Sequence, residues 1–237
     1  KAILMNAKVA VLIPAAGSSS RYKGKRKKQF VELDGRAVFL RTVEIFAERG
    51  DVKQIIVAIP GEDEELFTLK WQANVAFHGV KVVLGGQERH ETVQKMLAEV
   101  ADDIDLVALH DAVRPCVTQE QIDRVFEAAA KTGAALLAAP LVGTIKKVKT
   151  DGIIAETVDR SELWEAQTPQ VFKLDIIRRA YAEKGKLGKT ITDDAQLVEA
   201  LGHPVQIVES DAGNIKITTG IDLTIATAIL KTRTDSA

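Results

Sequence analysis

Short runs of apolar residues recur along the chain, and each ends at glycine, proline, histidine or an acidic residue. Their aliphatic and β-branched composition and their length indicate strands that are buried on both faces. These runs are Val9–Ile13, Ile55–Ile59, Val80–Leu84, Leu106–Leu109, Ala134–Ala139 and Val205–Val208.

Between the apolar runs, hydrophobic positions recur at helical spacing. The best-defined helical faces are Phe39 to Ala47, Val93 to Val100 and Ile122 to Ala129, and further helices are expected at Leu174 to Glu183, from Thr192-Asp193-Asp194 and from Asp222. Repeated alternation of strand and helix predicts an α/β fold, in which helices cover both faces of a Rossmann-like, doubly wound, mostly parallel sheet.

The alternation breaks after Pro140. Thr144–Val148 and Ile153–Val158 flank Asp151-Gly152, a dipeptide that favours a tight hairpin turn. We expect a β-hairpin that projects from the sheet. It is either a plain decoration or an arm that mediates oligomerisation or covers a site.

The length and charge of the chain limit what it can be. Its 237 residues are 46% hydrophobic and 27% charged, which suits one sizeable core and not two. We therefore expect one domain over residues 1–237, with residues 141–170 inserted as a β-arm. Because 32 Lys and Arg residues balance 33 Asp and Glu residues, no overall charge attracts nucleic acid or a membrane, and any anion site must be local.

Cys116 is the single cysteine, which excludes an intramolecular disulfide framework and a zinc site built from several cysteines. The chain has no run of about 18 apolar residues, and its start lacks the pattern of a secretory signal. We expect a soluble cytoplasmic protein.

In open parallel sheets, ligands bind beyond the carboxyl ends of the strands, so the turns that follow the strands are the places to examine. After the first strand, Pro14-Ala15-Ala16-Gly17 allows backbone N–H groups to approach an anion, and six cations follow within the eight residues 21–28. This pattern favours a triphosphate site, and the alternative is a solvated basic loop. The glycine spacing fits neither a Walker A loop nor a dinucleotide-binding fingerprint.

Two later turns add chemistry of other kinds. Gly85-Gly86 frees the backbone before a helix that could bring Thr92 near a base, although a glycine pair of this kind also occurs without a ligand. Next, Asp111 and Arg114 place a carboxylate and a guanidinium where a metal-bound nucleotide would lie. The alternatives are that Asp111 and Arg114 simply pair with each other and that His110 is a satisfied core histidine.

The fourth segment, Asn214–Thr218, is expected to form a short strand that pairs with Val205–Val208. Its lysine, Lys216, lies between Ile215 and Ile217 and should point away from both. Lys216 either reaches the site or is an edge lysine that prevents aggregation.

Taken in order, these segments resemble the 2-C-methyl-D-erythritol 4-phosphate cytidylyltransferase family, which acts in the non-mevalonate route to isoprenoid precursors. The resemblance spans nearly the whole chain. The matching residues are Pro14-Ala15-Ala16-Gly17 with Arg21 and Lys28-Gln29, Gly85-Gly86 with Glu88-Arg89, His110-Asp111-Ala112 with Arg114-Pro115, Asp159-Arg160 before Leu163-Trp164, Gln167-Thr168-Pro169-Gln170, Thr192-Asp193-Asp194-Ala195 and Asn214-Ile215-Lys216.

The resemblance implies transfer of CMP from CTP to a polyol phosphate, with Mg²⁺ bridging the triphosphate oxygens and Asp111 as a candidate metal ligand. Arg21, Lys28 and Lys216 would hold the CTP phosphates and stabilise the charge on the reacting phosphorus. The residues expected to bind the nucleotide are Ala15, Ala16, Gly17, Gly86, Thr92, Asp111 and Ala112. Those expected to bind the polyol phosphate are Asp111, Arg114, Thr144, Arg160, Thr168 and Thr192.

The resemblance also implies a homodimer, in which Thr144 and Arg160 reach the partner's site on the arm. In the family, proline often stands at the position of Lys27, so either Lys27 or Lys28 could reach the phosphates. We choose Lys28 because it precedes Gln29, and we expect the other cations of residues 23–27 only to steer the triphosphate.

Two competing functions remain open from the sequence. One is a cytidylyltransferase of the same fold that acts on ribitol 5-phosphate, against which Arg160 and Gln167-Thr168-Pro169-Gln170 favour methylerythritol phosphate by resemblance. The other is a nucleotide-binding regulatory module without catalysis. A degenerate module would be expected to lose some of Arg21, Lys28, Asp111 and Lys216, and all four are present.

Overall fold

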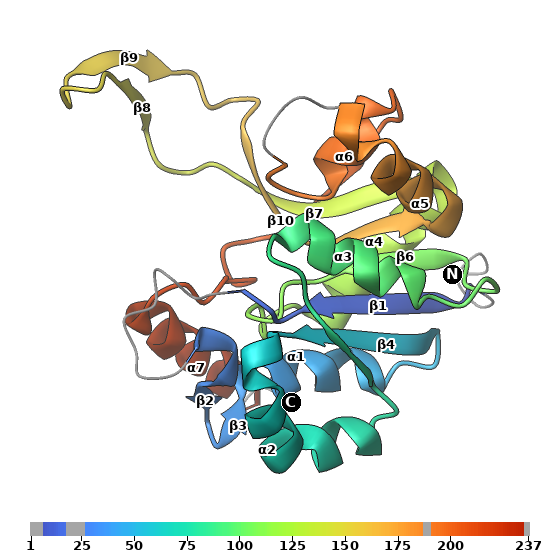
Figure 1. The fold of residues 1–237 in the computed structure, drawn as a ribbon. Helices are drawn as coiled ribbons and strands as arrows, with labels where there is room; N and C mark the ends of the chain where they lie inside the picture. Colours follow the sequence, from blue (N-terminus) through green and yellow to red (C-terminus); the bar gives the residue numbers. More distant parts are fainter. Residues whose placement is uncertain (1–6, 18–26, 187–190, 235–237) are drawn as a thin grey trace.

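The computed structural model describes residues 7–17, 27–186 and 191–234, and a seven-stranded sheet forms its centre (Figure 1). The strand order across the sheet is β11-β7-β10-β6-β1-β4-β5. The strands are β1 (Val9–Pro14), β4 (Val52–Ile59), β5 (Lys81–Leu84), β6 (Leu106–Leu109), β7 (Ala134–Pro140), β10 (Trp164–Lys173) and β11 (Gln206–Glu209). All neighbours pair in parallel except β10, which is antiparallel to both β6 and β7. The mostly parallel α/β sheet predicted from the sequence is confirmed.

Helices cover the sheet and short elements decorate it. The α-helices are α1 (Val38–Ala47), α2 (Glu64–Phe77), α3 (Arg89–Ala98), α4 (Gln119–Thr132), α5 (Leu174–Ala182), α6 (Ala195–Ala200) and α7 (Gly220–Thr234). The 3₁₀ helices are η2 (Lys28–Phe30), η3 (Gly61–Asp63) and η4 (Lys184–Lys186), and β2 (Glu32–Leu33) pairs with β3 (Arg36–Ala37) in a small hairpin. No helix in the described part of the chain is long and apolar enough to cross a membrane.

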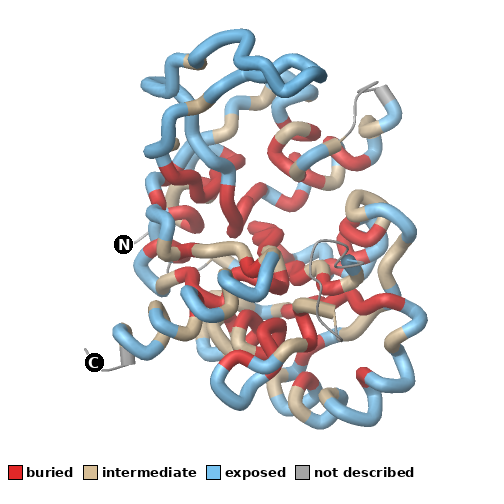
Figure 2. The backbone as a smooth tube through the Cα atoms, turned by 90° about the vertical axis from the view of Figure 1, so that its left-hand side faces the viewer, coloured by how far each residue is buried: buried red, intermediate tan, exposed pale blue. Residues whose placement is uncertain are grey.

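The central strands are apolar without interruption because both of their faces are buried. In β1, Val11 faces a core shared with α1 and α4, whereas Leu12 faces a second core shared with α3 and α5. Figure 2 shows these buried stretches in the middle of the molecule, with exposed chain around them. Continuous apolar runs are the pattern expected of parallel strands between two helical layers.

Two parts of the sheet region differ from the expectation. Trp164–Lys173, which the sequence analysis treats only as a motif, is the antiparallel strand β10 near the middle of the sheet. The predicted strand over Asn214–Thr218 is wrong, because this segment has no strand assignment and lies against the loop that follows β6. Ile217 donates its N–H to the carbonyl of Val113, 2.9 Å away, and its side chain is fully buried.

The predicted hairpin is confirmed: β8 (Ile145–Val148) and β9 (Ile154–Val158) pair in an antiparallel ribbon that projects from the sheet (Figure 1). At its tip, Lys149 donates its N–H to the carbonyl of Ile153, and Gly152 adopts φ 82°, a left-handed conformation that favours glycine. Residues 164–170, at the end of the range expected for the arm, belong to β10 and thus to the central sheet.

Candidate active site

The carboxyl ends of β1, β4, β5 and β6 surround a cleft of about 1080 Å³. Its lining comes from the turn after β1, η2, η3, the turn between β5 and α3, α3 itself, the loop after β6, and Lys216. The lining residues are Pro14, Ala16, Gly17, Lys28, Gln29, Pro60, Gly61, Glu62, Leu84, Gly85, Gly86, Gln87, Glu88, Arg89, Glu91, Thr92, Gln94, Lys95, Ala98, Asp111, Ala112, Val113 and Lys216. The cleft therefore lies where an open α/β sheet places its ligand.

The turn after β1 is held in place by the buried side chain of Gln29. Its Nε2 donates to the carbonyl of Ala15 at 2.7 Å and to that of Gly17 at 3.2 Å. Ala15 also donates its own N–H to the carbonyl of Ala58 at 2.8 Å, which ties the turn to the end of β4. The short loop is thus fixed before any ligand is present.

The glycine pair at the end of β5 is required by close packing. A Cβ on Gly85 would lie 2.4 Å from Cβ of Ala16, and a Cβ on Gly86 would lie 2.5 Å from Cβ of Glu91. Neither glycine has a positive φ, so the lack of space for a side chain, and not the backbone conformation, requires glycine at both positions. The two small-residue turns consequently meet at one end of the cleft.

Thr92 fixes the turn that precedes α3. Its buried hydroxyl accepts the N–H of Gly86 at 2.9 Å and donates to the carbonyl of Glu88 at 3.2 Å. Oε2 of Glu91 accepts the N–H groups of Gln87 and Glu88 at 2.9 and 3.2 Å, which completes a capping box at the helix start. With its proton on the Glu88 carbonyl, the Thr92 hydroxyl offers a lone pair that can accept a hydrogen bond from a ligand.

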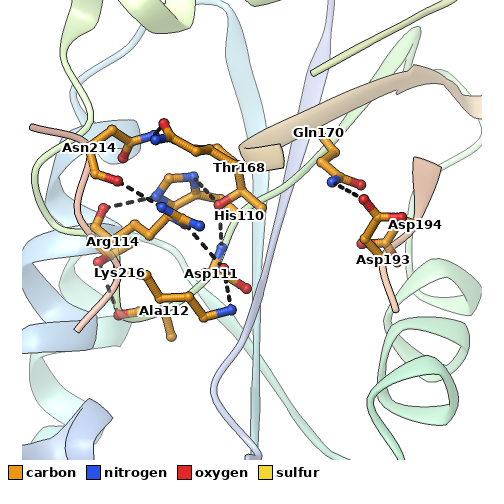
Figure 3. A network of polar contacts seen from close by, with 12 residues as sticks. His110, Asp111, Ala112, Arg114, Thr168, Gln170, Asp193, Asp194, Asn214 and Lys216 are labelled. Carbon is orange, nitrogen blue, oxygen red and sulfur yellow. Dashed lines mark hydrogen bonds and ion pairs between the residues drawn. The ribbon is translucent and has the colours of Figure 1, made fainter. Parts of the chain in front are cut away.

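Asp111 follows β6 and carries the main negative charge of the cleft floor. Its Oδ2 accepts hydrogen bonds from Nζ of Lys216 at 2.8 Å and from Nε of Arg114 at 3.3 Å (Figure 3). Burial alone would raise the pKa of the Asp111 carboxyl, but the positive charges of Lys216, Arg89 and Arg114 outweigh burial and hold that pKa well below its usual range. Asp111 is therefore an ionised carboxylate at neutral pH.

His110 lies beneath Asp111 and is completely buried. The contacts assign its tautomer: Nε2–H donates to the carbonyl of Arg114 at 3.0 Å, and Nδ1 accepts the hydroxyl of Thr168 at 3.2 Å. The Thr168 oxygen in turn accepts the N–H of Asp111 at 3.0 Å. Burial lowers the pKa of His110 to about 4, so the ring is neutral and serves as a framework group, the core histidine that the sequence left as an alternative.

Asn214 ties the segment of Lys216 to β10 and to the loop after β6. Its Nδ2 donates to Oε1 of Gln167 at 2.9 Å and to the carbonyl of Thr168 at 3.0 Å. Nη1 of Arg114 donates to the Asn214 carbonyl at 2.7 Å. These bonds place Lys216 opposite Asp111, as Figure 3 shows, and they replace the sheet pairing expected for this segment.

A second polar network flanks the cleft on the side of α6. Nη2 of Arg89 lies 2.6 Å from Oδ2 of the fully buried Asp194, whose Oδ1 accepts the hydroxyl of Tyr181 at 2.6 Å. Next to this pair, the Gln170 amide donates to Oδ2 of Asp193 at 2.9 Å. Burial, and then the charge of Asp194, raise the pKa of Tyr181, which keeps its proton in this bond.

A family model for 2-C-methyl-D-erythritol 4-phosphate cytidylyltransferase matches residues 9–232. The chain belongs to this family. A cytidylyltransferase of this name from Rhodopirellula baltica is 45% identical over 235 residues, covering 94% of this chain and 95% of the relative. One from Endomicrobium trichonymphae is 44% identical over 224 residues, covering 94% and 99%.

Solved structures of family members share the fold. The crystal structure of 2-C-methyl-D-erythritol 4-phosphate cytidylyltransferase from Thermus thermophilus has a TM-score of 0.78 at 33% identity, covering 94% of this chain and 99% of that one. The 4-diphosphocytidyl-2C-methyl-D-erythritol synthase of Anaerococcus prevotii gives 0.83 at 27% identity, covering 98% and 99%. The comparisons support methylerythritol phosphate over the ribitol phosphate alternative, because the names of these relatives all refer to methylerythritol.

The structure brings together most of the residues that the family resemblance assigns to the nucleotide. Ala15, in the turn after β1, is buried and does not line the cleft, and Arg21 lies outside the described residues. The expected residues that line the cleft are Ala16, Gly17, Lys28, Gly86, Thr92, Asp111, Ala112 and Lys216.

The structure also separates the two lysines between which the family pattern left a choice. Nζ of Lys27 lies 2.6 Å from Oε1 of Glu62 and 2.6 Å from Oδ2 of Asp63, whereas Lys28 lines the cleft. Lys27 thus has carboxylate partners of its own in η3. Lys28 remains our candidate for the phosphates.

The residues expected to bind the polyol phosphate fall into two groups. Asp111, Arg114 and Thr168 lie together in the network beneath the cleft. Thr192 is exposed, and its hydroxyl and N–H both contact Oε1 of Gln196. Thr144 and Arg160 are exposed at either end of the arm and are absent from the described lining of the cleft. The chain therefore does not bring these two to its own cleft.

The role of Arg89, Asp194 and Tyr181 was missed from the sequence. Arg89 and Asp194 stand in the family motifs without an assigned part, and 105 positions separate them. The available signal was their charge: an arginine that opens a helix at a strand end and an aspartate before a buried helix each need a partner.

Proposed function

We propose that this protein transfers CMP from CTP to 2-C-methyl-D-erythritol 4-phosphate and releases pyrophosphate, forming 4-diphosphocytidyl-2-C-methyl-D-erythritol for isoprenoid precursors. Family membership supports this activity. The observation that carries it is the cleft itself, in which two small-residue turns, Lys28 and the Lys216–Asp111 pair lie around one space. The buried thiol of Cys116 suits the reducing cytoplasm, where we place the reaction.

The reaction needs no nucleophilic side chain. An oxygen of the substrate's own phosphate, ionised at neutral pH, attacks the α-phosphorus of CTP, the bond to the pyrophosphate oxygen breaks, and pyrophosphate leaves. The protein's task is to align the two phosphates and to offset charge that builds up on the α-phosphate. In this proposal Lys28, Lys216 and Arg21 supply the positive charge.

The nucleotide end of the cleft favours cytosine in this proposal. While the Thr92 hydroxyl donates to the Glu88 carbonyl, it presents an acceptor to the ligand, which suits the exocyclic amino group of cytosine better than the carbonyl that uracil has at that position. Gly85, Gly86 and Ala16 leave the backbone accessible beside it. The preference for CTP over UTP would therefore rest on a hydrogen bond whose direction is fixed by Glu88.

The polyol end requires a second copy of the chain in this proposal. Asp111 and Thr168 lie in the chain's own network, and Thr144 and Arg160 would come from the arm of the partner in a homodimer. Exposed apolar side chains on the arm support such an interface: Val148 is 58% exposed, Ile153 60% and Ile154 56%. Buried against a partner, these side chains would contribute favourably to association.

Mg²⁺ is part of the proposed reaction, and the donor set of the cleft fits a metal that enters with the triphosphate. The described residues contain no group of three His, Cys, Asp or Glu side chains that could hold a metal ion. Asp111 offers a carboxylate of the kind Mg²⁺ prefers and uses Oδ2 for Lys216 and Arg114. When bound, the metal would offset the charge of the leaving pyrophosphate.

The decisive experiment crosses CTP, UTP and ATP with methylerythritol phosphate and ribitol 5-phosphate and measures pyrophosphate release. We expect pyrophosphate release only when CTP is combined with methylerythritol phosphate. Release with ribitol phosphate alone would overturn the substrate assignment. If no pair gave release while CTP still bound, the protein would be a nucleotide-binding module.

A further inference from the structure

Lys27 adjoins the candidate phosphate-binding Lys28, and its side chain is committed to two carboxylates. Its Nζ lies 2.6 Å from Glu62 Oε1 and 2.6 Å from Asp63 Oδ2, both in η3. The Lys27 side chain is 22% exposed, Asp63 is 18% exposed and Glu62 is 71% exposed. The three charges form a compact cluster at the edge of the cleft, and Glu62 is part of the lining.

The chain around Lys27 is anchored independently of these ion pairs. Gln29 holds the carbonyls of Ala15 and Gly17, and Phe30 is buried and stacks on Trp71 with ring centroids 4.9 Å apart. Lys27 itself has φ −60° and ψ 139°, a conformation that proline also adopts. The backbone here therefore does not need the lysine side chain.

What the lysine side chain supplies is charge. Without this lysine, the negative charges of Glu62 and Asp63 would be uncompensated at the edge of the cleft in which we place the triphosphate. Hydrogen bonding to Lys27 lowers the pKa of the Glu62 carboxyl, so Glu62 is charged at neutral pH. Charges at the surface act over about 8 Å at physiological ionic strength, which reaches into the cleft that Glu62 lines.

We propose that Lys27 is a positioning residue for CTP, which neutralises Glu62 and Asp63 so that these carboxylates do not repel the triphosphate from Lys28. The inference rests on the proposed function for the identity of the nucleotide. It assigns to Lys27 a role other than steering the triphosphate.

The test measures CTP binding by isothermal titration calorimetry without the second substrate, next to kcat and KM. In Lys27→Met and in Lys27→Pro, which keeps the backbone conformation, we expect the Kd and KM for CTP to rise about tenfold, with kcat within about twofold. The melting temperature is measured alongside, because the part-buried Lys27–Asp63 pair can also contribute to stability, and CTP binding is compared at a temperature at which every variant is folded. The loss of affinity should shrink at 0.5 M salt, at which charges are screened over about 4 Å.

The rescue experiment separates repulsion from a mechanical tether. Adding Glu62→Gln and Asp63→Asn to Lys27→Met should restore the affinity for CTP, and the same two changes with Lys27 intact should not weaken it. Lys81→Met, which breaks an ion pair with Glu99 outside the cleft, is the matched control and should leave the Kd unchanged.

Two results would overturn the role of Lys27: an unchanged Kd in Lys27→Met, or failure of the triple variant to recover. If the wild-type protein bound CTP but released no pyrophosphate, the proposed function would fail while the binding data still decided the role of Lys27.

Discussion

The cleft and the arm differ in which kinds of side chain the chain buries. In the cleft, polar side chains are buried and bond within the chain: the fully buried Asn214 donates its amide N–H groups to Gln167 and Thr168, Thr168 is 5% exposed, and both contribute to the network that holds Asp111. On the arm, apolar groups are exposed, and its ion pair between Lys147 and Glu156 is open to water. The cleft is thus organised by one chain, whereas the arm displays surface that one chain does not bury.

Substitutions in the two regions should therefore have different effects. A change in the cleft should alter chemistry or the stability of the single chain, because the contacts it removes are internal. A change on the arm should alter association first, and activity only through the residues that a partner would supply. A substitution in one region should therefore leave the other region intact.

The largest effect is expected at Lys216. Replacing it with alanine removes a cation from the reacting phosphate and should lower kcat by about 100-fold or more, which corresponds to roughly 2.7 kcal/mol of barrier. Pyrophosphate release measures the loss, and thermal unfolding checks that the fold remains. Lys131→Ala, at an exposed site in the last turn of α4, is the control. Near-normal turnover in Lys216→Ala would remove Lys216 from the catalytic set.

The next effect is expected at Gly85. A methyl group there would lie 2.4 Å from Cβ of Ala16, so Gly85→Ala should lower the free energy of unfolding by about 2 kcal/mol and push the two turns of the cleft apart. Urea denaturation measures the change. Gly50→Ala, where the added carbon meets no atom within 4 Å, should be nearly neutral. Equal stability of the two variants would show that the turns can separate freely.

On the arm, Ile154→Asp should break association and leave the core intact. A charge on this exposed strand residue cannot be buried against a partner without a large desolvation penalty, so the proposed dimer should dissociate. Light scattering should show a monomer, and activity should fall about tenfold as the partner's Arg160 is lost. Leu69→Asp, at an exposed leucine of α2, is the matched control and should do neither. A monomeric wild type with full activity would contradict the proposed role of the arm.

The most gradual effect concerns His110 and pH. Its pKa is about 4 in the folded protein and about 6.5 when exposed, so the unfolded chain binds more protons between these values. His110 should therefore lower the free energy of unfolding as pH falls from 6.5 toward 4, by at most about 1.4 kcal/mol per pH unit. Denaturant titrations at several pH values measure this slope. A pKa near 6.5 for His110 by NMR would contradict it.

Much of the fold was predictable because double burial leaves a strong mark on the sequence. The apolar runs gave six of the seven sheet strands, and the rule that ligands bind at strand ends pointed to both small-residue turns and to Asp111. β10 was not predicted as a strand because its buried positions include Gln167, Thr168 and Gln170. The burial of these side chains depends on specific hydrogen bonds and not on hydrophobicity.

The contacts that the sequence did not reveal are those between distant charges. The ion pairs of Lys27 join positions 35 and 36 residues apart, and no local periodicity records them. The same holds for Lys216, whose segment was predicted as a short strand because Ile215 and Ile217 flank it. Its partner, Asp111, was identified as a site residue, but the pairing of the two needed the fold.

The hydrogen bonds of His110 also make the ring a natural spectroscopic reporter. All four histidines lie in the described part of the chain, and His110 is the one that is fully buried. Its Nε2 proton is held on the Arg114 carbonyl and shielded from water, so it should exchange slowly and give a separate proton resonance in unlabelled protein. Because the other ring nitrogen touches Thr168, which touches Asp111, that single line would follow the floor of the cleft as each substrate arrives.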